Sequence, residues 1–366
     1  MCSLDITDYA ALFLNDIAMM DTRSPGEFAR GSFPAASSLP LMSDQERAQV
    51  GTCYKQQGQQ AAIALGHKLV SGEIKQQRVD AWLQFTARQP NGALYCWRGG
   101  LRSKTCQQWL REAGCEYPRV AGGYKAMRRF LIETLEKTCA EQKIIILAGH
   151  TGSAKTELLQ QLPNNIDLEA LAQHRGSAFG KRITPQPAQI DFENALAVQL
   201  LKCAHQNPHQ PIVLEDESHL IGKCFLPPAL QIAMAKAPLI VVESELAERT
   251  DHSFNKYILH NLYELQQRHG EGRGFELFAA ELRASLHNIR RRLGGKRYDE
   301  LLAVLERAID AHAAGDCTLH REWVEILLRD YYAPMYEYQL DKKRDRVVFR
   351  GARKAVLDWV LAGVEL

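Results

Sequence analysis

The stretch KIIILAGHTGSAKTELLQQL, residues 143–162, decides the fold of the middle of the chain. It opens with an apolar run at residues 143–148, continues into a glycine-containing turn at residues 149–156, and ends in a segment of helical composition. A buried strand, a phosphate-binding loop and a helix follow one another in this order in nucleotide-binding α/β proteins. We therefore predict a parallel α/β domain of the P-loop NTPase type around this strand.

The turn fits the phosphate-loop pattern GxxxxGK[ST] at every position except residue 154, which is alanine. Loop amides would cradle a di- or triphosphate, the lysine would reach its outer oxygens, and the threonine hydroxyl would meet Mg²⁺. The methyl group at position 154 lies where backbone must approach phosphate, which argues against tight nucleotide binding and rapid hydrolysis. The expected ligand-binding residues are Gly149, Gly152, Ser153, Lys155 and Thr156.

Two further segments bear on this loop. PIVLE and LIVVE, residues 211–215 and 239–243, read as buried strands, and residues 191–205 between them read as a helix. The first strand runs into the acids of LEDES, where a carboxylate at the strand end would hold magnesium through water. Asp216 is the favoured metal and cofactor-site residue, followed by Glu215, and a solvated acidic loop is the alternative. HRGSAFG, residues 174–180, is a small-residue loop that would close over an anion.

The first part of the chain carries its own α/β pattern. Strands are expected at residues 17–20 and 92–97, with helices at residues 44–69, 73–88, 101–113 and 122–135. Beyond about residue 250 strand signals fade, and amphipathic stretches at residues 274–293 and 298–314 predict a helical C-terminal part. The predicted division is an N-terminal α/β domain over 1–135, a P-loop domain over 136–250 and a helical region over 251–366.

Composition sets limits on function. The 366 residues carry 46% hydrophobic residues and a net charge of only +2, so any nucleic-acid surface must be local. The nine cysteines are an odd number without a CxxC pair, which argues against a disulfide framework and a zinc site. The start, MCSLDITDYAALFLND, has acids where a signal peptide needs basic residues, and no apolar run could span a bilayer. We expect no membrane association and a reducing cytoplasm.

A reactive-cysteine loop is expected in the first domain, at CWRGGLRS, residues 96–103. Cys96 follows a strand, and the glycine-containing loop after it leads into a helix, so backbone amides and the helix N-terminus favour a thiolate and an anion. Arg98 and Arg102 would bind oxyanion groups beside it. A buried structural cysteine is the alternative, since free cysteine packs as a small hydrophobe.

This loop resembles that of the rhodanese family, and DTRSPGEFARGSFPAA, residues 21–36, resembles the upstream rhodanese signature. The resemblance implies that Cys96 carries a transferable sulfur or selenium atom, and that Asp21, Arg23 and Glu27 have a structural role. Five residues separate Cys96 from Arg102, where the usual sulfur-transfer loop has four. The longer loop suits a phosphate-like anion and also resembles the loop of cysteine phosphatases.

Taken together, the rhodanese loop, GGYKA at 122–126, the phosphate loop, HRGSAFG, EDES and YYAPMYEYQ at 331–339 resemble, in this order, the bacterial tRNA selenouridine synthases. The resemblance covers essentially the whole chain. It implies that a wobble 2-thiouridine of tRNA is converted to 2-selenouridine with selenophosphate, and that geranyl diphosphate S-geranylates the thiouridine. It also implies tRNA as partner, with an enzyme that supplies selenophosphate; the sequence leaves the oligomeric state open.

In this reading the phosphate loop, with Mg²⁺, holds the diphosphate of the geranyl donor, while Cys96 with its arginines receives or orients selenium. The tRNA needs a basic surface, and ordinary solvated helix faces are the alternative for every basic run. Tyr331, Tyr332, Tyr336 or Tyr338 would stack on an anticodon base or belong to the core. The favoured tRNA-binding residues are Arg290, Arg291, Arg292, Lys296 and Arg297, followed by residues 341–346 and Lys125, Arg128 and Arg129.

Three other functions fit parts of the sequence. An ATP-dependent rhodanese-type sulfurtransferase acting on RNA, or a kinase fused to a rhodanese domain, would use the phosphate loop to activate a substrate. A cysteine phosphatase would explain the five-residue spacing but has no use for the phosphate loop. Two degenerate binding modules would explain Ala154, whereas intact Cys96, Lys155 and Thr156 argue against them.

Overall fold

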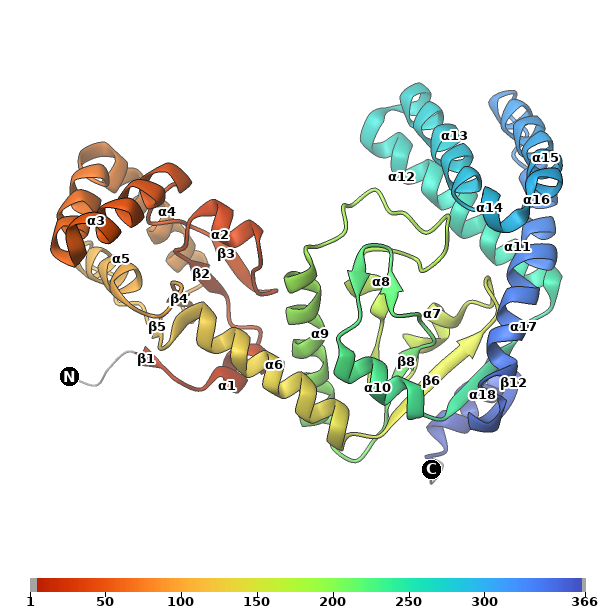
Figure 1. Cartoon of the computed structure of the whole chain (residues 1–366), viewed down its shortest axis with the longest axis horizontal. Helices are drawn as coiled ribbons and strands as arrows, with labels where there is room; N and C mark the ends of the chain where they lie inside the picture. Colours follow the sequence, from red (N-terminus) through yellow and green to blue (C-terminus); the bar gives the residue numbers. More distant parts are fainter. Residues whose placement is uncertain (1–4, 364–366) are drawn as a thin grey trace. The chain divides into compact units, whose positions relative to one another are not determined.

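The computed structural model describes residues 5–363, which divide into two compact units (Figure 1). The first unit comprises residues 5–138 and 188–202, and the second comprises residues 139–187 and 203–363. This differs from the expected three-part division in two places. Residues 188–202 belong with the first unit, and the C-terminal helical region is continuous with the phosphate-loop unit.

The first unit is built on a five-stranded sheet in the order β1-β5-β4-β2-β3, with every pair parallel. Its strands are β1 (Asp5–Ile6), β2 (Met19–Asp21), β3 (Ala36–Ser38), β4 (Ala93–Tyr95) and β5 (Arg119–Val120). Its helices are α1 (Tyr9–Leu14), α2 (Pro25–Ala29), α3 (Asp44–Leu69), α4 (Gly72–Arg88), α5 (Leu101–Glu112) and α6 (Gly123–Glu141, of which 139–141 fall in the second unit). Most of α9 (Gln189–Gln206) completes it.

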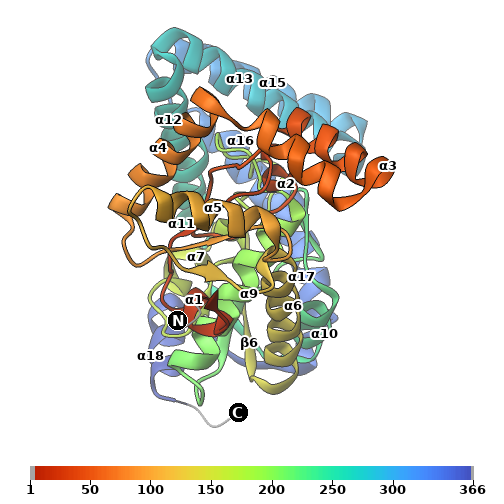
Figure 2. The same cartoon turned by 90° about the vertical axis from the view of Figure 1, so that its left-hand side faces the viewer.

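Helices cover both faces of this sheet (Figure 2). Trp82 of α4 and Trp109 of α5 share a buried cluster with Met20 and Leu94 of the central strands. On α1 and α6, Phe13 and other aromatic side chains pack together. Helices α3 and α4 lie where the sequence predicts them, because apolar residues recur there at helical spacing.

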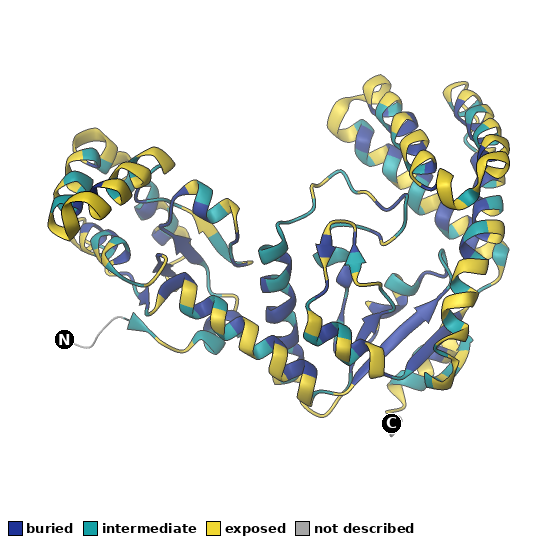
Figure 3. Cartoon of the chain, in the orientation of Figure 1, coloured by how far each residue is buried: buried dark blue, intermediate teal, exposed yellow. Residues whose placement is uncertain are grey.

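The second unit has a five-stranded sheet in the order β12-β11-β6-β8-β7, again wholly parallel. All six residues of β6 are buried, as Figure 3 shows, because helices cover both faces of a parallel sheet. The strands are β6 (Ile144–Gly149), β7 (Asn165–Ile166), β8 (Ile212–Glu215), β11 (Leu239–Glu243) and β12 (Val347–Ala352), with a separate antiparallel hairpin of β9 (Leu220–Ile221) and β10 (Cys224–Phe225).

Strand β12 corrects the expectation that the C-terminal region is helical throughout. It pairs in parallel with β11 as the edge strand of the second sheet. Its residues alternate between half-buried and exposed, so it lacks the continuous apolar run that marks the central strands. The C-terminal region therefore completes the phosphate-loop sheet and is not a separate domain.

A helical layer follows β11, and its apolar faces share one core that includes Phe278, Leu305 and Trp323. Figure 1 shows α12 and α13 running side by side, with α15 and α16 close by. The helices of this unit are α7 (Lys155–Leu159), α8 (Leu168–Leu171), α10 (Pro228–Lys236), α11 (Leu246–Ser253), α12 (His260–His269), α13 (Glu271–Asn288), α14 (Arg290–Leu293), α15 (Gly295–Ala313), α16 (His320–Leu327), α17 (Ala333–Asp341) and α18 (Arg353–Leu361). Two π-helical segments, η1 (Phe254–Leu259) and η2 (Leu328–Tyr332), and the 3₁₀ turn η3 (Arg344–Arg346) connect them.

The described residues contain neither a disulfide bond nor a helix suited to crossing a membrane. Between residues 5 and 363, all eight cysteines are free thiols, and Cys2 lies outside this range. Over the same range no helix has the length and apolar character needed to cross a membrane.

Candidate functional site

Cys96 lies directly after β4, at the carboxyl end of a central strand of the first sheet. It is 2% exposed, and its Sγ lies 3.2 Å from the Oγ of Ser103 on α5. The Ser103 hydroxyl also donates to the carbonyl of Gly100, 3.1 Å away. The thiol is therefore positioned by the first turn of the helix that follows its loop.

Residues 97–100 form an open loop between Cys96 and α5. Within the described chain, the backbone amides of these four residues donate to no other residue. They are followed by the N-terminus of α5, a 12-residue helix whose first N–H groups also lack intrahelical acceptors. This arrangement provides hydrogen-bond donors and positive potential for an anion next to the thiol.

The GGYKA segment, residues 122–126, is hydrogen-bonded to this loop. The amide of Tyr124 donates to the Cys96 carbonyl over 2.8 Å, and that of Lys125 donates to the Trp97 carbonyl over 3.0 Å. Gly123 has φ +59° and would place a Cβ 2.2 Å from the Cys96 carbonyl oxygen, so only glycine fits there. The motif therefore has a steric function, which is to let α6 begin against the cysteine loop.

Residues of the upstream signature, 21–36, stabilise the strand that leads into the cysteine loop. The Arg23 guanidinium pairs with the Asp21 carboxylate at 2.6 Å, and both side chains are almost fully buried. Tyr95 donates its hydroxyl to Asp21 over 2.7 Å, and Arg23 lies 3.8 Å from the ring centroid of Tyr124. This network ties β2 to β4 and α6, which agrees with the structural role expected for Asp21 and Arg23.

The two loop arginines differ. Arg102 donates to both carboxylate oxygens of Glu27, at 2.5 and 3.3 Å, so its charge is already paired within the protein. Although burial opposes ionisation, the hydrogen bond and charge of Arg102 lower the pKa of Glu27. Arg98 is exposed and has no ion pair with any described residue. The structure thus leaves Arg98 available for an anion, whereas Arg102 holds α5 against α2.

In the second unit, the phosphate loop follows β6, the central strand of its sheet. Within residues 5–363, the amides of Thr151, Gly152 and residues 154–156 donate to no protein acceptor. Gly149 and Gly152 are sterically required, since a Cβ at Gly149 would lie 2.9 Å from the Val242 carbonyl oxygen and one at Gly152 would lie 2.7 Å from that of Arg249. The loop therefore has the free donors that a phosphate ligand needs.

Lys155 and Ala154 adopt special conformations. The Lys155 ammonium donates back to the carbonyls of Gly149 and His150, at 2.7 and 3.4 Å, where it can turn to an incoming phosphate. Ala154 is buried and has φ +57°, the left-handed region in which a side chain costs roughly 1 kcal/mol. The alanine is thus accommodated with backbone strain, and the loop keeps its shape.

The acidic residue beside the loop is Glu215, which corrects the preference for Asp216. The Thr156 hydroxyl donates to the Glu215 carboxylate over 2.9 Å, whereas the Asp216 carboxylate accepts from Lys343 at 2.7 and 3.0 Å. Glu215 is the last residue of β8, and the chain turns after it, so the next side chain points elsewhere. Thr156 and Glu215 together offer two oxygens for a cation.

Carboxyl groups gather around Glu215. Burial, reinforced by the charges of Glu169 and Asp167, raises the pKa of Glu215 to about 8. Burial and the charges of Glu169 and Glu215 likewise raise the pKa of Glu217 to about 8. A Cβ on Gly176 would lie 2.7 Å from Glu169 and 2.9 Å from Glu217, so the HRGSAFG loop packs against these acids. No cluster of three metal-ligating side chains occurs anywhere in residues 5–363.

These pKa values predict a pH-dependent stability. The folded protein keeps protons on Glu215 and Glu217 that the unfolded chain releases above about pH 4.5. The free energy of unfolding should therefore fall between about pH 4.5 and 8, by at most about 1.4 kcal/mol per pH unit for each group. Glu217→Gln cannot ionise, so its Tm should exceed that of the wild type at pH 8 and match it at pH 5.

Thermal unfolding at both pH values measures this difference. Glu300→Gln, which replaces an exposed glutamate of α15, is the control and should leave the pH dependence unchanged. A Glu217→Gln variant with the same Tm offset at pH 5 and pH 8 would contradict the raised pKa.

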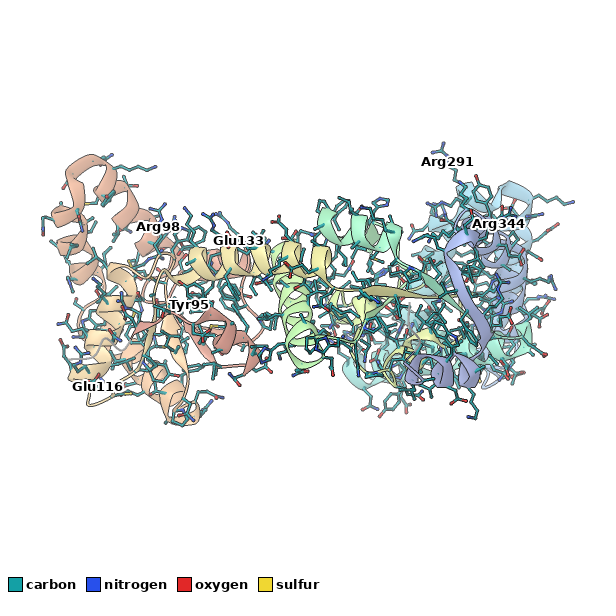
Figure 4. The ribbon with its side chains drawn as sticks, turned by 90° about the horizontal axis from the view of Figure 1, so that it is seen from below. Tyr95, Arg98, Glu116, Glu133, Arg291 and Arg344 are labelled. Carbon is teal, nitrogen blue, oxygen red and sulfur yellow. The ribbon has the colours of Figure 1, made fainter. Side chains whose placement is uncertain are left out.

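The predicted basic surface lies on α14 and the start of α15. Every residue of the set is exposed, and Figure 4 shows Arg291 extending away from the ribbon. Arg290 lies over the ring of Tyr298 at 5.0 Å. The charge of Arg297 contributes, after Arg329, to the lowered pKa of Asp330. Among the described residues, no carboxylate pairs with Arg291, Arg292 or Lys296. These three cations therefore remain available to a polyanion.

The other nucleic-acid candidates are less available. Arg128 pairs with Glu193, and Arg129 pairs with Glu133 at 2.7 Å. Tyr332 is buried, and Tyr336 packs against His150 with ring centroids 4.2 Å apart, whereas Tyr338 is 64% exposed. Ser103 and Glu217 lie within the quoted motifs CWRGGLRS and LEDES, but the sequence assigned them no role. Arg249 lies outside every quoted motif and was not predicted.

Known proteins are similar to this chain over most of its length. A family described as the tRNA 2-selenouridine synthase AAA domain matches residues 142–365. Proteins named tRNA 2-selenouridine synthase are similar over nearly the full chain: one from Hahella chejuensis is 58% identical over 97% of this chain and 94% of its own. One from Pseudomonas fluorescens is 52% identical over 98% of both chains.

A crystal structure of the N-terminal domain of a Clostridium difficile protein described as binding ATP or GTP is 32% identical over 35% of this chain and 98% of that chain. Its TM-score is 0.31, so it carries no argument about the fold.

Proposed function

The chain belongs to the tRNA 2-selenouridine synthases, a family of tRNA-modifying enzymes, and from this premise we propose that it converts wobble 2-thiouridine to 2-selenouridine through an S-geranylated intermediate. Geranyl diphosphate and selenophosphate are the proposed co-substrates. The reaction takes place in the cytoplasm, where tRNA is available, and an enzyme that makes selenophosphate supplies the selenium.

The phosphate loop carries the proposal. Its free amides, Lys155 and the Thr156 hydroxyl recognise phosphate oxygens and require no nucleoside. A diphosphate ester therefore satisfies this site as well as a nucleotide does. Binding the diphosphate at the loop stabilises the charge that develops on it as it leaves the geranyl carbon.

Mg²⁺ fits the same site. It takes one or two protein oxygens together with phosphate oxygens and waters, and Thr156 and Glu215 offer two oxygens side by side. When bound, the cation would neutralise the diphosphate charge. Glu215 is the proposed carboxyl ligand, in place of Asp216, and it would release its proton when the cation binds.

The first unit is proposed to be the rhodanese-like selenium-handling domain. The free amides of residues 97–100 and the exposed Arg98 suit the phosphate group of selenophosphate. Cys96 lies at the end of that loop, where its thiol would orient the selenium of selenophosphate for attack on C2 of the base. Arg102 is assigned to positioning, because its charge is paired with Glu27.

The two reactions balance without a redox reagent. The thiocarbonyl sulfur of the uridine attacks the geranyl carbon, a C–S bond forms, and diphosphate leaves with the electrons of the C–O bond. Selenium then attacks C2 of the base, and geranyl thiol leaves after taking up a proton. Water finally cleaves the phosphorus–selenium bond and releases phosphate. Alkylation is needed because a thiocarbonyl sulfur is a poor leaving group, whereas a thiol is a good one.

The proposed tRNA surface is the basic set on α14 and α15. Replacing Arg291 and Arg292 by glutamate should reduce the slope of log affinity against log salt by about 2 and weaken tRNA binding roughly tenfold at moderate salt. Electrophoretic titration of tRNA at several salt concentrations measures both quantities. Lys354→Glu, an exposed charge reversal on α18, is the control. An unchanged slope in the double variant would place the RNA on another surface.

The function is tested by mass analysis of nucleosides from thiolated tRNA incubated with the protein, geranyl diphosphate and selenophosphate. Geranylthiouridine with the first co-substrate alone, and selenouridine with both, are the expected products. ATP-dependent formation of a sulfur-containing product from uridine would instead support the sulfurtransferase. If thiouridine stays unchanged with both co-substrates, the proposed reaction is wrong for this chain.

A further inference from the structure

Beside the phosphate loop lies a group of buried polar atoms that have no hydrogen-bond partner among the described residues. They come from the loop itself, from α11 and from α17. Such atoms are rare in folded proteins, because a buried donor without an acceptor costs about 1–3 kcal/mol. The set consists of His150 Nδ1, Ser153 Oγ, Arg249 Nε and Nη1, Ser253 Oγ and Tyr336 Oη.

Direct contacts connect these atoms to the loop. A Cβ on Gly152 would lie 2.7 Å from both the Arg249 carbonyl oxygen and the Ser253 hydroxyl, so α11 lies directly against the turn. The His150 ring packs on Tyr336 of α17, and the charge of Arg249 helps to lower the pKa of His150. Burial and neighbouring cations lower the pKa of His150 to about 4, which keeps this imidazole neutral.

Arg249 is the charged member of the group. Its side chain is 7% exposed, yet no carboxylate of the described chain forms an ion pair with it. Burying a guanidinium is costly, and burial lowers the pKa of Arg249. The charge of Glu337 acts in the opposite direction but forms no ion pair with Arg249, so the protein offsets only part of the cost. An anionic ligand would supply the missing partner.

The course of α11 gives independent support. The helix ends at Ser253 and continues into the π-helical segment η1, and π-helical turns are frequent at functional sites. The same helix presents Arg249 and Ser253 one turn apart, on the side that meets Gly152. The β-carbon of Arg249 and the hydroxyl of Ser253 therefore lie against Gly152, one of the loop residues whose amides would hold a phosphate.

We propose that Arg249, with Ser253, forms a second phosphate-binding element of this site and contacts the diphosphate that the phosphate loop holds. The inference rests on the proposed diphosphate role of the loop. It assigns a positioning and charge-neutralising function to α11 that Lys155 alone would not provide. Guanidinium groups bind phosphate oxygens with charge-assisted hydrogen bonds, which neutral donors of the loop cannot match.

The test measures binding of inorganic pyrophosphate with Mg²⁺ to the full-length protein by titration calorimetry. Arg249→Gln should weaken binding at least tenfold, and Arg249→Lys should retain part of the affinity because it keeps the charge. The Tm of ligand-free Arg249→Gln should equal or exceed that of the wild type, because the substitution removes an unpaired buried charge. Arg283→Gln, in an exposed ion pair with Glu306, is the control and should bind like the wild type.

Each result decides the inference. Unchanged pyrophosphate affinity in Arg249→Gln, while Lys155→Ala binds more weakly, overturns the role of Arg249 and leaves the proposed function standing. A lowered Tm of both ligand-free Arg249 variants, accompanied by lost binding, shows a structural arginine and also overturns it. If the wild type binds no pyrophosphate, the diphosphate role of the loop and the inference fail together.

Discussion

A Lys155→Ala variant is expected to form neither geranylthiouridine nor selenouridine from thiolated tRNA. Among the described residues, the Lys155 ammonium donates only to loop carbonyls, at 2.7 and 3.4 Å, and is free to reach a diphosphate. Removing one charged group that stabilises a leaving anion typically costs about 10²–10³-fold in rate. Because selenium replaces the geranylated sulfur, the second product should fall with the first.

Mass analysis of the nucleosides, at enzyme and co-substrate concentrations that give full conversion by the wild type, measures this loss. Lys236→Ala, at the exposed end of α10 in the same unit, is the matched control and should remain active. The Tm of each variant shows whether the loop remains folded. A folded Lys155→Ala protein that geranylates at the wild-type rate would remove the phosphate loop from the reaction.

The fold of the second unit was predictable around β6 because its chemistry is local. A central parallel strand is buried on both faces, so it appears in the sequence as the uninterrupted run of residues 144–148, and the loop pattern follows at once. Strand β12 could not be found in this way. It is an edge strand whose partner, β11, lies more than 100 residues earlier, and its half-exposed residues include Arg350.

Some site residues could also be predicted from the sequence, and others could not. Cys96, Lys155 and Thr156 occupy motif positions, whereas the choice between Glu215 and Asp216 depends on the residue at which β8 ends. A difference of one residue sends the side chain to another partner, here Lys343 in place of Thr156. Arg249 has no sequence signal, because its significance lies in two buried nitrogens, Nε and Nη1, that find no hydrogen-bond partner in the described part of the folded chain.

A Cys96→Ala variant is expected to lose selenouridine by at least about 10³-fold and to keep forming geranylthiouridine. The thiol lies at the start of the loop that has free amides, and it contacts the Ser103 hydroxyl at 3.2 Å. Cys96→Ser keeps nearly the same size but replaces the thiol by a hydroxyl, so it separates packing from the chemistry of the thiol. Cys53→Ala, which replaces another buried cysteine of the first unit, is the control.

Supplying tRNA that already carries geranylthiouridine separates the two sites. With selenophosphate, Lys155→Ala should convert this tRNA to selenouridine, because the step that needs the diphosphate has been bypassed. Cys96→Ala should leave it unconverted, because the missing thiol belongs to the second step. If Cys96→Ala makes selenouridine from it at the wild-type rate, Cys96 is a structural cysteine and the loop at residues 97–100 acts through its amides and Arg98 alone.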